Sequence, residues 1–503
     1  MRESVRRAAG WGVSAIALLA LAGCDLGPDY HRPDLEIPPA YRASTATAAA
    51  AWPAEDWWRG FGSPELTSLV DQARRENFDL LAAIARVRQA DAQVRIAGAG
   101  LLPSLGVTAN ANWLQESLAN AGVGGRGRTT NVDVHDYTAG LNISYVLDFW
   151  GKITANRQAA VANAMFSRFD QQTVALTVVT SVASTWFTAL GDADLLVVQQ
   201  HNLADSEQTL AVIRGRLDVG TASALDVAQQ EALVAGLRAT IPALRSQLEQ
   251  EVIGLGILIG QPPEAVTVQP GTLDTLALPP VGAGLPSELL QRRPDVASAE
   301  AQLIAANFDV KVARAAFFPQ IQLTGSAGFE ATALGVLFGP GGFLTTAAAG
   351  LSQPIFDGGV LRGQLEQARG RQAELLEDYR KAVVQAFTDV DNALVAWRYA
   401  TEQEALQRVA VDTARRAADI ARAQMAAGTV DITTVLTAET TYFTDETTLV
   451  QVRLARAQAL LSLYKALGGG WNEPPGPVPD QFPGLSPGVV PGGVALPIGG
   501  NLR

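Results

Sequence analysis

The chain has 503 residues, of which 48% are hydrophobic and only 17% are charged, an apolar composition for a water-soluble protein. Its formal net charge is −12, because 50 Asp and Glu outnumber 38 Lys and Arg. This balance argues against nucleic acid as a partner, since binding phosphates requires an excess of basic side chains.

The N-terminus has the features of a lipoprotein leader. Residues 1–23 combine a basic start, an apolar run over 10–22 and the small residues Ala22 and Gly23 directly before Cys24. Cys24 is the only cysteine, so an internal disulfide is impossible. We expect a signal peptide over 1–23 and a lipidated segment over 24–62, with the lipid on Cys24 as the only covalent group and no cofactor. The alternative is a buried thiol that carries no lipid.

After residue 23 we find no hydrophobic run long enough for a membrane-spanning helix. Four stretches instead alternate between apolar and polar residues, at about 104–113, 137–149, 320–330 and 343–356. In the first, Leu105 and Val107 share one face and Thr108 and Asn110 share the other. Lengths near 10 residues with this alternation are typical of lipid-facing barrel strands. Residues 112–136 and 330–342 are expected as the loops that join each pair. The alternative, a soluble sandwich, fits poorly with the helical remainder.

Two segments without proline, about 150–218 and 358–427, predict helices roughly 100 Å long. Shorter helices are expected at 77–97 and 223–259, and again at 295–315 and 431–467. Each shorter pair, laid end to end, matches the length of a long helix and can lie antiparallel beside it. A coiled-coil rod is the alternative, but a rod does not require four lipid-type strands.

The chain contains the same design twice. Gly220-Thr221 recurs as Gly428-Thr429, and Gly260 corresponds to Gly468, both at an offset of 208 residues. A period this long indicates a duplicated half-domain rather than a solenoid. We predict a first repeat over 63–262, a linker over 263–285, a second repeat over 286–469 and a Pro- and Gly-rich tail over 470–503.

Four strands cannot close a barrel, and an open edge in hydrocarbon leaves unpaired backbone groups that cost several kcal/mol each. Several chains must therefore combine their strands. The fold class expected from the sequence is mostly α with membrane β, built on an internal duplication.

Several motifs resemble those of the TolC-like outer-membrane factors, in particular the NodT-type lipoprotein branch that serves resistance-nodulation-division (RND) pumps. The resemblance covers nearly all of the chain after the leader. The motifs that carry it are Cys24 followed by Gly27-Pro28-Asp29-Tyr30, Trp57-Trp58 with Phe61, Arg292-Arg293-Pro294-Asp295, Ala316-Phe317-Phe318-Pro319, and the paired Gly-Thr turns.

The resemblance implies a homotrimer, in which three chains form a twelve-stranded β-barrel continued by a long α-helical barrel in the periplasm. It places the protein in the cell outer membrane, in contact with outer-membrane lipid. It further implies a passive exit duct for small molecules, with a periplasmic adaptor protein and an inner-membrane RND pump as partners. Asp25 follows the lipid site, where aspartate is associated in enteric bacteria with retention in the inner membrane, and we expect the barrel to override it.

By the same resemblance, Gly220, Thr221, Gly428 and Thr429 mark the two periplasmic tips where the adaptor docks. Glycine suits such a position, because it supplies the left-handed residue that ends a helix before a reversal.

The resemblance also points to an aperture. In well-known family members, carboxylates six and nine residues after the second tip glycine form a ring that holds the mouth closed, but here these positions are Thr434 and Thr437. Asp431, and Asp226 six residues after Gly220, are the nearest acids and could substitute for the ring. The alternative is that both are helix-start acids favoured by the helix dipole.

Enzymatic chemistry has little support. The three histidines, His31, His135 and His201, lack metal-ligand spacing, and no HExxH, P-loop or GxSxG motif occurs. We expect no catalytic and no metal-binding residue, and interpret Pro294 as the start of a helix. Two other functions remain open besides efflux: the outer-membrane duct of a type I protein secretion system, and a non-conducting periplasmic tether. The cargo, the particular pump and the gating residues cannot be read from the sequence.

Overall fold

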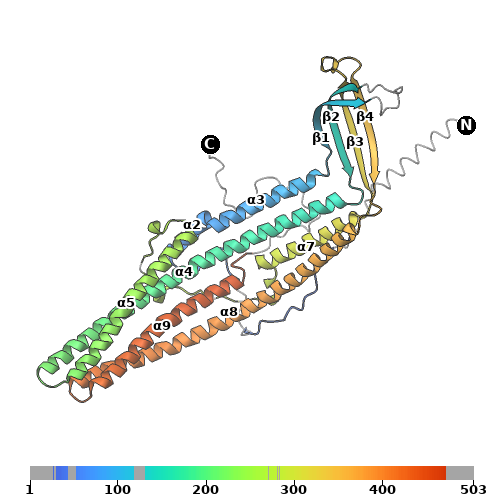
Figure 1. Ribbon diagram of the computed structural model, residues 1–503. Coiled ribbons are helices and arrows are strands. Elements are labelled where there is room, and N and C mark those ends of the chain that lie inside the picture. Colours follow the sequence, from blue (N-terminus) through green and yellow to red (C-terminus); the bar gives the residue numbers. More distant parts are fainter. Residues whose placement is uncertain are drawn as a thin grey trace.

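The computed structural model describes residues 27, 30–43, 52–117, 131–269, 271–279, 281–282 and 284–471. In this part of the chain, an elongated helical body carries a β-sheet at one end and two helical hairpins at the other (Figure 1). The expected leader, the lipid site Cys24 and nearly all of the expected tail lie outside the described residues. The architecture is mostly α with one membrane-type sheet.

The sheet contains β1 (Ser104–Ser117), β2 (Asn131–Leu147), β3 (Gln320–Ala331) and β4 (Phe343–Ser352) in that order. All neighbouring strands are antiparallel. The central pair, β2 and β3, joins the two halves of the chain. The outer strands β1 and β4 each pair on one side only, so the sheet of a single chain is open at both edges.

Four strand boundaries differ from the expectation. The hairpin of β1 and β2 extends to the pair Ser117 and Asn131, so the first loop is shorter than 112–136. Backbone pairing continues there although the apolar alternation fades. β2 ends at Leu147 because Asp148 turns to accept the amide hydrogens of Ile153 and Thr154. β4 ends at Ser352, not 356, because Pro354 lacks the N–H that a ladder requires.

The helical body repeats one pattern in each half. In the first half, α2 (Pro64–Glu76) and α3 (Phe78–Ala99) precede the sheet hairpin, and α4 (Lys152–Asp218) and α5 (Ala224–Ile259) follow it. In the second half the order is α6 (Pro286–Leu289), α7 (Pro294–Ala315), the hairpin, α8 (Val360–Ala426) and α9 (Ile432–Ala466). Short 3-10 turns lie at η1 (Trp57–Phe61), η2 (Pro263–Ala265), η3 (Leu273–Thr275) and η4 (Leu334–Val336).

The two 67-residue helices α4 and α8 form the long axis, each about 100 Å at 1.5 Å per residue. Helices α3 and α5 lie along α4, and α7 and α9 lie along α8 (Figure 1). Helix α4 also packs against α7 and α9, which connects the two halves within one chain.

The largest core lies at the middle of the body. Trp57 stacks on Tyr464 with ring centroids 4.8 Å apart, and Phe61 meets Phe187 edge-on at 5.1 Å. Trp57, Trp58 and Phe61 are all buried, so these aromatic residues pack the core. Arg293 is buried just before α7 and forms ion pairs with Asp295 and Asp389, a structural role for this motif.

The expectation that no helix after the leader is apolar enough to cross a membrane was wrong for α4. One 18-residue window of α4 has a mean hydropathy of 1.5 and passes that test by length and composition. However, 56% of this window is buried inside the structure. Its apolar side chains therefore pack largely against neighbouring helices.

Candidate functional site

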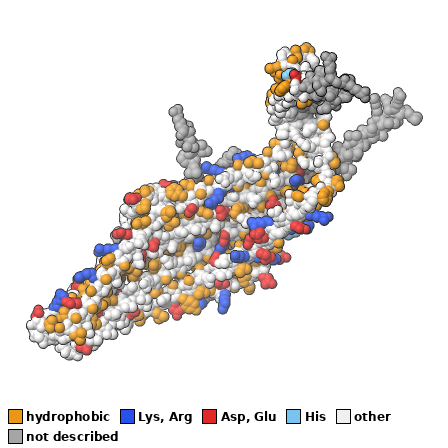
Figure 2. Space-filling model, viewed as in Figure 1, with side chains coloured by type: hydrophobic (Ala, Val, Ile, Leu, Met, Phe, Trp, Pro, Cys, Tyr) orange, Lys and Arg blue, Asp and Glu red, His pale blue; other side chains and the backbone are white. Residues whose placement is uncertain are grey.

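The sheet has one apolar and one polar face. On β1, Leu105 and Val107 are 71% and 77% exposed, and on β2, Leu141 and Ile143 continue the same face at 49% and 45%. Exposed aliphatic side chains in register across neighbouring strands are unfavourable in water and suit a lipid environment. Charged side chains cover the helical body but are nearly absent from the visible face of the sheet (Figure 2).

The opposite face carries hydrogen bonds between side chains of adjacent strands. Asn142 donates to Thr108 at 2.9 Å across β1 and β2, and Gln322 donates to Ser144 at 3.0 Å across β2 and β3. Ser326 and Thr346 are 2.7 Å apart across β3 and β4. These neutral polar groups form a surface suited to line a water-filled duct.

The two tips are built alike. Gly220 and Gly428 have φ angles of +77° and +75°, a left-handed conformation that a residue with a Cβ adopts at a cost. After each glycine, a threonine N–H returns to the preceding helix: Thr221 to the Arg216 carbonyl at 2.8 Å, and Thr429 to the Gln424 carbonyl at 2.9 Å. The threonine hydroxyls donate to the same carbonyls. The Gly-Thr pair therefore ends one helix and reverses the chain.

The acidic aperture candidates lie at helix starts. Asp226 forms a capping box with Ser223, accepting the Ser223 N–H at 2.7 Å. Asp431 is the N-cap of α9 and accepts the Thr434 hydroxyl at 2.7 Å and its N–H at 3.0 Å. These two hydrogen bonds hold the pKa of Asp431 below its usual value. Both carboxylates thus cap helices.

The threonine candidates lie on one exposed side of α9. The Thr434 hydroxyl donates to Asp431, and the Thr437 hydroxyl donates to the carbonyl of Thr433. Thr437 also lines a shallow groove of about 480 Å³ together with Leu436, Thr440, Thr441, Thr444 and Asp445. This surface is polar and carries little charge.

A buried ionic network just above the tips was not found by sequence reasoning. Glu439 on α9 is fully buried and accepts hydrogen bonds from Arg422 on α8 at 2.7 Å and from Thr209 on α4 at 2.9 Å. Arg422 also contacts Asp205 on α4 at 3.2 Å. The sequence nevertheless indicates this site, because Glu439 lies on the same buried side of α9 as Ile432, Val435 and Phe443.

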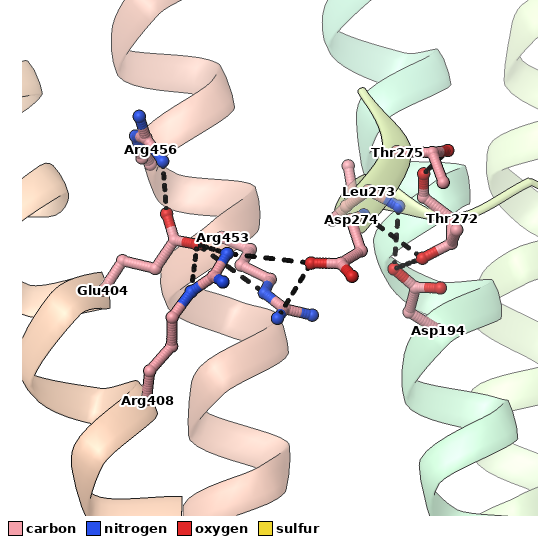
Figure 3. Close-up of polar contacts among 9 residues, drawn as sticks. All are labelled: Asp194, Thr272, Leu273, Asp274, Thr275, Glu404, Arg408, Arg453 and Arg456. Atoms are coloured by element: carbon pink, nitrogen blue, oxygen red, sulfur yellow. Dashed lines mark hydrogen bonds and ion pairs between the residues drawn. The ribbon is translucent and has the colours of Figure 1, made fainter. Parts of the chain in front are cut away.

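A second network connects the linker to the helices (Figure 3). Glu404 on α8 accepts from Arg408 at 2.7 Å and from Arg456 on α9 at 2.8 Å. Arg453 approaches Glu404 and pairs with Asp274 of η3 at 2.9 Å. Burial raises the pKa of Glu404, but the hydrogen bonds from Arg456 and Arg408 outweigh burial, so this pKa lies below its usual value.

The same linker turn is attached to α4. Asp194 accepts the Leu273 N–H at 2.9 Å and the Thr272 hydroxyl at 3.1 Å (Figure 3). Burial raises the pKa of Asp194, and these two hydrogen bonds partly offset it. Helices α4, α8 and α9 are thus held together through one short segment of the linker.

Among the residues that the structure describes, no group of three or more His, Cys, Asp or Glu could hold a metal ion. The functional features are instead a lipid-type sheet, a helical body about 100 Å long and two tips at the far end. Together they define a class of protein: an outer-membrane channel with a periplasmic helical extension.

The chain belongs to the outer membrane efflux protein family, whose model matches residues 69–261 and 285–469. It is 40% identical over 457 residues to the pyoverdine export outer membrane protein OpmQ of Pseudomonas aeruginosa, covering 91% of this chain and 96% of OpmQ. It is 32% identical to the toluene efflux pump outer membrane protein TtgC of Pseudomonas putida, covering 93% and 97%. The open-state MtrE outer membrane channel of Neisseria gonorrhoeae superposes with a TM-score of 0.80 at 29% identity, covering 90% and 99%.

The protein is therefore an outer-membrane channel component of an efflux system, located in the outer membrane and extending into the periplasm. This confirms the expected family, fold class and localisation. Its named relatives are transport proteins rather than enzymes.

Proposed function

We propose that this chain forms a homotrimeric, passive exit duct for small molecules in a tripartite RND-type efflux system. The observation that carries the proposal is the open sheet, in which β1 and β4 each have one unpaired edge. In a membrane those backbone groups must be satisfied, which β1 of one chain and β4 of the next can do. Such head-to-tail contacts form a closed ring.

The number of copies follows from the width of the barrel. Two chains would supply eight strands, a size at which side chains fill the interior. Three chains supply twelve strands and leave room for a polar lumen. The hydrogen-bonded Ser, Thr, Asn and Gln face of the sheet supports this arrangement.

Exposed apolar side chains on the edge helices support the same ring. On α8, Leu406, Val409 and Ile420 are 65%, 62% and 57% exposed in one chain. On the opposite edge, Ile257 of α5 is 72% exposed and Phe78 of α3 is 65% exposed. Contact between α8 of one protomer and α3 and α5 of the next would bury these surfaces.

The position of Gly27 supports a lipid anchor on Cys24. Gly27 lies so close to Lys311 that an added Cβ would collide with that side chain. Lys311 is one turn from the end of α7 at Ala315, and β3 begins at Gln320. Cys24 precedes Gly27 by three residues, which span at most about 11 Å. An acyl chain on Cys24 can therefore enter the membrane beside the sheet.

The two tips are proposed to dock a periplasmic adaptor, because Gly220-Thr221 and Gly428-Thr429 present matching turns at the end far from the membrane. The test is crosslinking in cells from Val219→Cys and Ala427→Cys, next to the tip glycines, with mass spectrometry of captured proteins. Cys24, the only natural cysteine, is blocked if it carries a lipid.

Capture of an adaptor together with an RND pump is the expected result. Capture of an ABC exporter would reassign the protein to type I secretion. Capture of neither, with no conductance in planar bilayers, would favour the periplasmic tether.

The aperture is tested separately by the closed-state conductance of Asp226→Ala and Asp431→Ala channels. If either carboxylate contributes to an electrostatic closure, its removal raises the leak of cations. Because both carboxylates cap helices, Asp226→Asn and Asp431→Asn, which retain capping ability, are the matched controls. Unchanged leak in all four variants would remove the electrostatic role and leave closure to packing.

The cargo is proposed to be selected mainly by the pump. OpmQ is named for pyoverdine export and TtgC for toluene efflux, although both resemble this chain over more than 90% of its length. The polar face of the sheet carries neutral groups that favour no particular small molecule. Replacing the partner pump should therefore change the exported compounds without any change in this chain.

A further inference from the structure

The membrane end of the helical body is basic although the whole chain is acidic. The four segments nearest the sheet are 88–103, 148–163, 304–319 and 353–371, which together contain nine Lys or Arg and five Asp or Glu. Their net charge is +4, whereas the chain as a whole carries −12. Figure 2 shows Lys and Arg side chains where α8 approaches the base of the sheet.

Apolar and aromatic side chains mark the membrane boundary just above this level. Trp150 stacks on Phe318 with ring centroids 4.7 Å apart, and its indole N–H donates to the Pro319 carbonyl at 2.8 Å. Ile355 and Phe356, between β4 and α8, are both 92% exposed. Aromatic residues at such a junction are typical of the interface between membrane and water. Side chains one to three turns below lie at the depth of lipid headgroups.

The N-terminal segment identifies the outer face of α7. Arg32 and Tyr30 bind Glu300, and Gly27 lies against Lys311, so this segment follows one side of the helix. A segment that leads to a lipid anchor must run on the outside of the barrel. At about 100° per residue, Arg314 projects within roughly 40° of Glu300 and therefore faces outward as well.

The same reasoning orients α8. Asp391 accepts the Ala43 N–H at 3.0 Å, which marks the outer face of this helix. Arg362 and Arg369 precede Arg371 by nine and two residues, so both project on the side of α8 away from Arg371. Arg371 projects on the opposite side, where it lines a cavity of about 600 Å³ with Asp309 of α7.

Within the described part of the chain, Arg314, Arg362 and Arg369 form no ion pair, whereas Arg371 on the other face pairs with Glu374 at 2.6 Å. Glu366 lies between Arg362 and Arg369 on the same face, and Asp357 interacts electrostatically with Arg362. Both carboxylates reduce the positive potential of the arginines. The outer face nevertheless keeps an excess of positive charge directly below the aromatic boundary.

We propose that Arg314, Arg362 and Arg369 form a binding site for anionic phospholipid headgroups of the periplasmic leaflet. Guanidinium groups bind phosphate oxygens through paired hydrogen bonds, and basic residues near a membrane surface attract anionic lipid. The proposal rests on the outer-membrane location and on the proposed lipid anchor. In a trimer the site occurs three times around the channel.

The test uses the purified full-length protein in a neutral detergent. Phosphatidylglycerol is titrated against the wild type, Arg314→Gln/Arg362→Gln/Arg369→Gln and Arg371→Gln, and bound lipids are counted by native mass spectrometry. At about fivefold in affinity per arginine, the triple variant should bind on the order of 100-fold more weakly. Arg371→Gln should bind like the wild type, and Glu366→Gln should bind about fivefold more tightly.

Phosphatidylcholine should bind weakly in every variant, and phosphatidylglycerol binding should fall as NaCl concentration rises. Equal binding of phosphatidylglycerol by the triple variant and the wild type would overturn the proposal. So would equal binding of the two lipids to the wild type. Single-channel conductance tests the proposed channel function separately from lipid binding. A triple variant that loses lipid binding but conducts like the wild type still forms an intact duct.

Discussion

The buried pair of Arg422 and Glu439 allows a quantitative prediction. Replacing Arg422 by Met leaves Glu439, which is fully buried, with the Thr209 hydroxyl as its one remaining hydrogen-bond donor among the contacts described. Removing one partner of a buried ion pair typically costs 3–5 kcal/mol, because the remaining charge stays in a low-dielectric environment. Since the Arg422 side chain is 26% exposed, we expect the lower end, about 3 kcal/mol.

The other variants of the pair should be milder. In Glu439→Gln, Arg422 keeps Asp205 and Asp419 as partners and the amide oxygen can still accept, so we expect about 1 kcal/mol. In the double variant Arg422→Met/Glu439→Leu, no buried charge remains at this position. Asp205 and Asp419 lose Arg422, but their side chains are 42% and 58% exposed, so the change should be small.

The assay is hydrogen–deuterium exchange of the amides at 418–426 and 435–443 in the purified channel. A loss of about 3 kcal/mol in local stability raises the exchange rate roughly 100-fold where exchange requires local opening. Arg380→Met is the matched control, because it breaks an exposed pair with Glu377 on the same helix. The reasoning fails if Arg422→Met exchanges no faster than Arg380→Met, or if the double variant exchanges as fast as Arg422→Met.

Three further predictions concern the tips, the sheet and the linker. Gly428→Ala should destabilise the second tip by about 1 kcal/mol, because Gly428 has a positive φ. Gly370 lies in the interior of α8 with open space around it, so Gly370→Ala should stabilise the protein by up to about 1 kcal/mol. Thermal unfolding of the two variants measures this difference. Leu141→Arg on the lipid face should cost about 2–4 kcal/mol and reduce assembly in the outer membrane, while Asn110→Arg on the polar face should assemble normally, as fractionation would show. Because the pKa of Glu404 is lowered in the folded protein, Glu404 contributes stability above its usual pKa near 4.5, and this contribution is lost as the pH falls through the lower folded value. The difference in Tm between wild type and Glu404→Gln should therefore shrink between pH 5 and pH 3. A constant difference would refute this prediction.

The general architecture was accessible from the sequence because two periodicities coexist in it. Alternation with period two identified the faces of β1 to β4, and long segments without proline identified α4 and α8. The ends of the strands were less accessible, since Asp148 and Pro354 act through local hydrogen bonding rather than periodicity. Likewise, the pairing of β1 and β2 beyond residue 113 depends on backbone groups, which every sequence offers equally.

The networks were harder to predict because their members are far apart in sequence. Glu404 depends on Arg456, 52 residues later, and Glu439 depends on Thr209, 230 residues earlier. Only the position of Glu439 in an apolar row suggested that it needed a partner. Asp226 and Asp431 were correctly placed at helix starts, but the sequence could not show that their oxygens are engaged in caps.

The two tips share one turn geometry but differ in what holds them. In the first hairpin, Arg214 pairs with Glu231 at 2.6 Å, a contact between α4 and α5 that stays within the hairpin. In the second hairpin, Glu439 and Arg422 reach across to Thr209 and Asp205 on α4. Any separation of the second hairpin from α4 must therefore break the buried hydrogen bond from Thr209 to the Glu439 carboxylate. Within the first hairpin, the buried contact is a hydrogen bond from the Gln230 amide to the Ser206 carbonyl, which involves no carboxylate. Because exposed ion pairs contribute at most about 1 kcal/mol, we expect the contacts of Glu439 to provide the main resistance when the second tip moves away from α4.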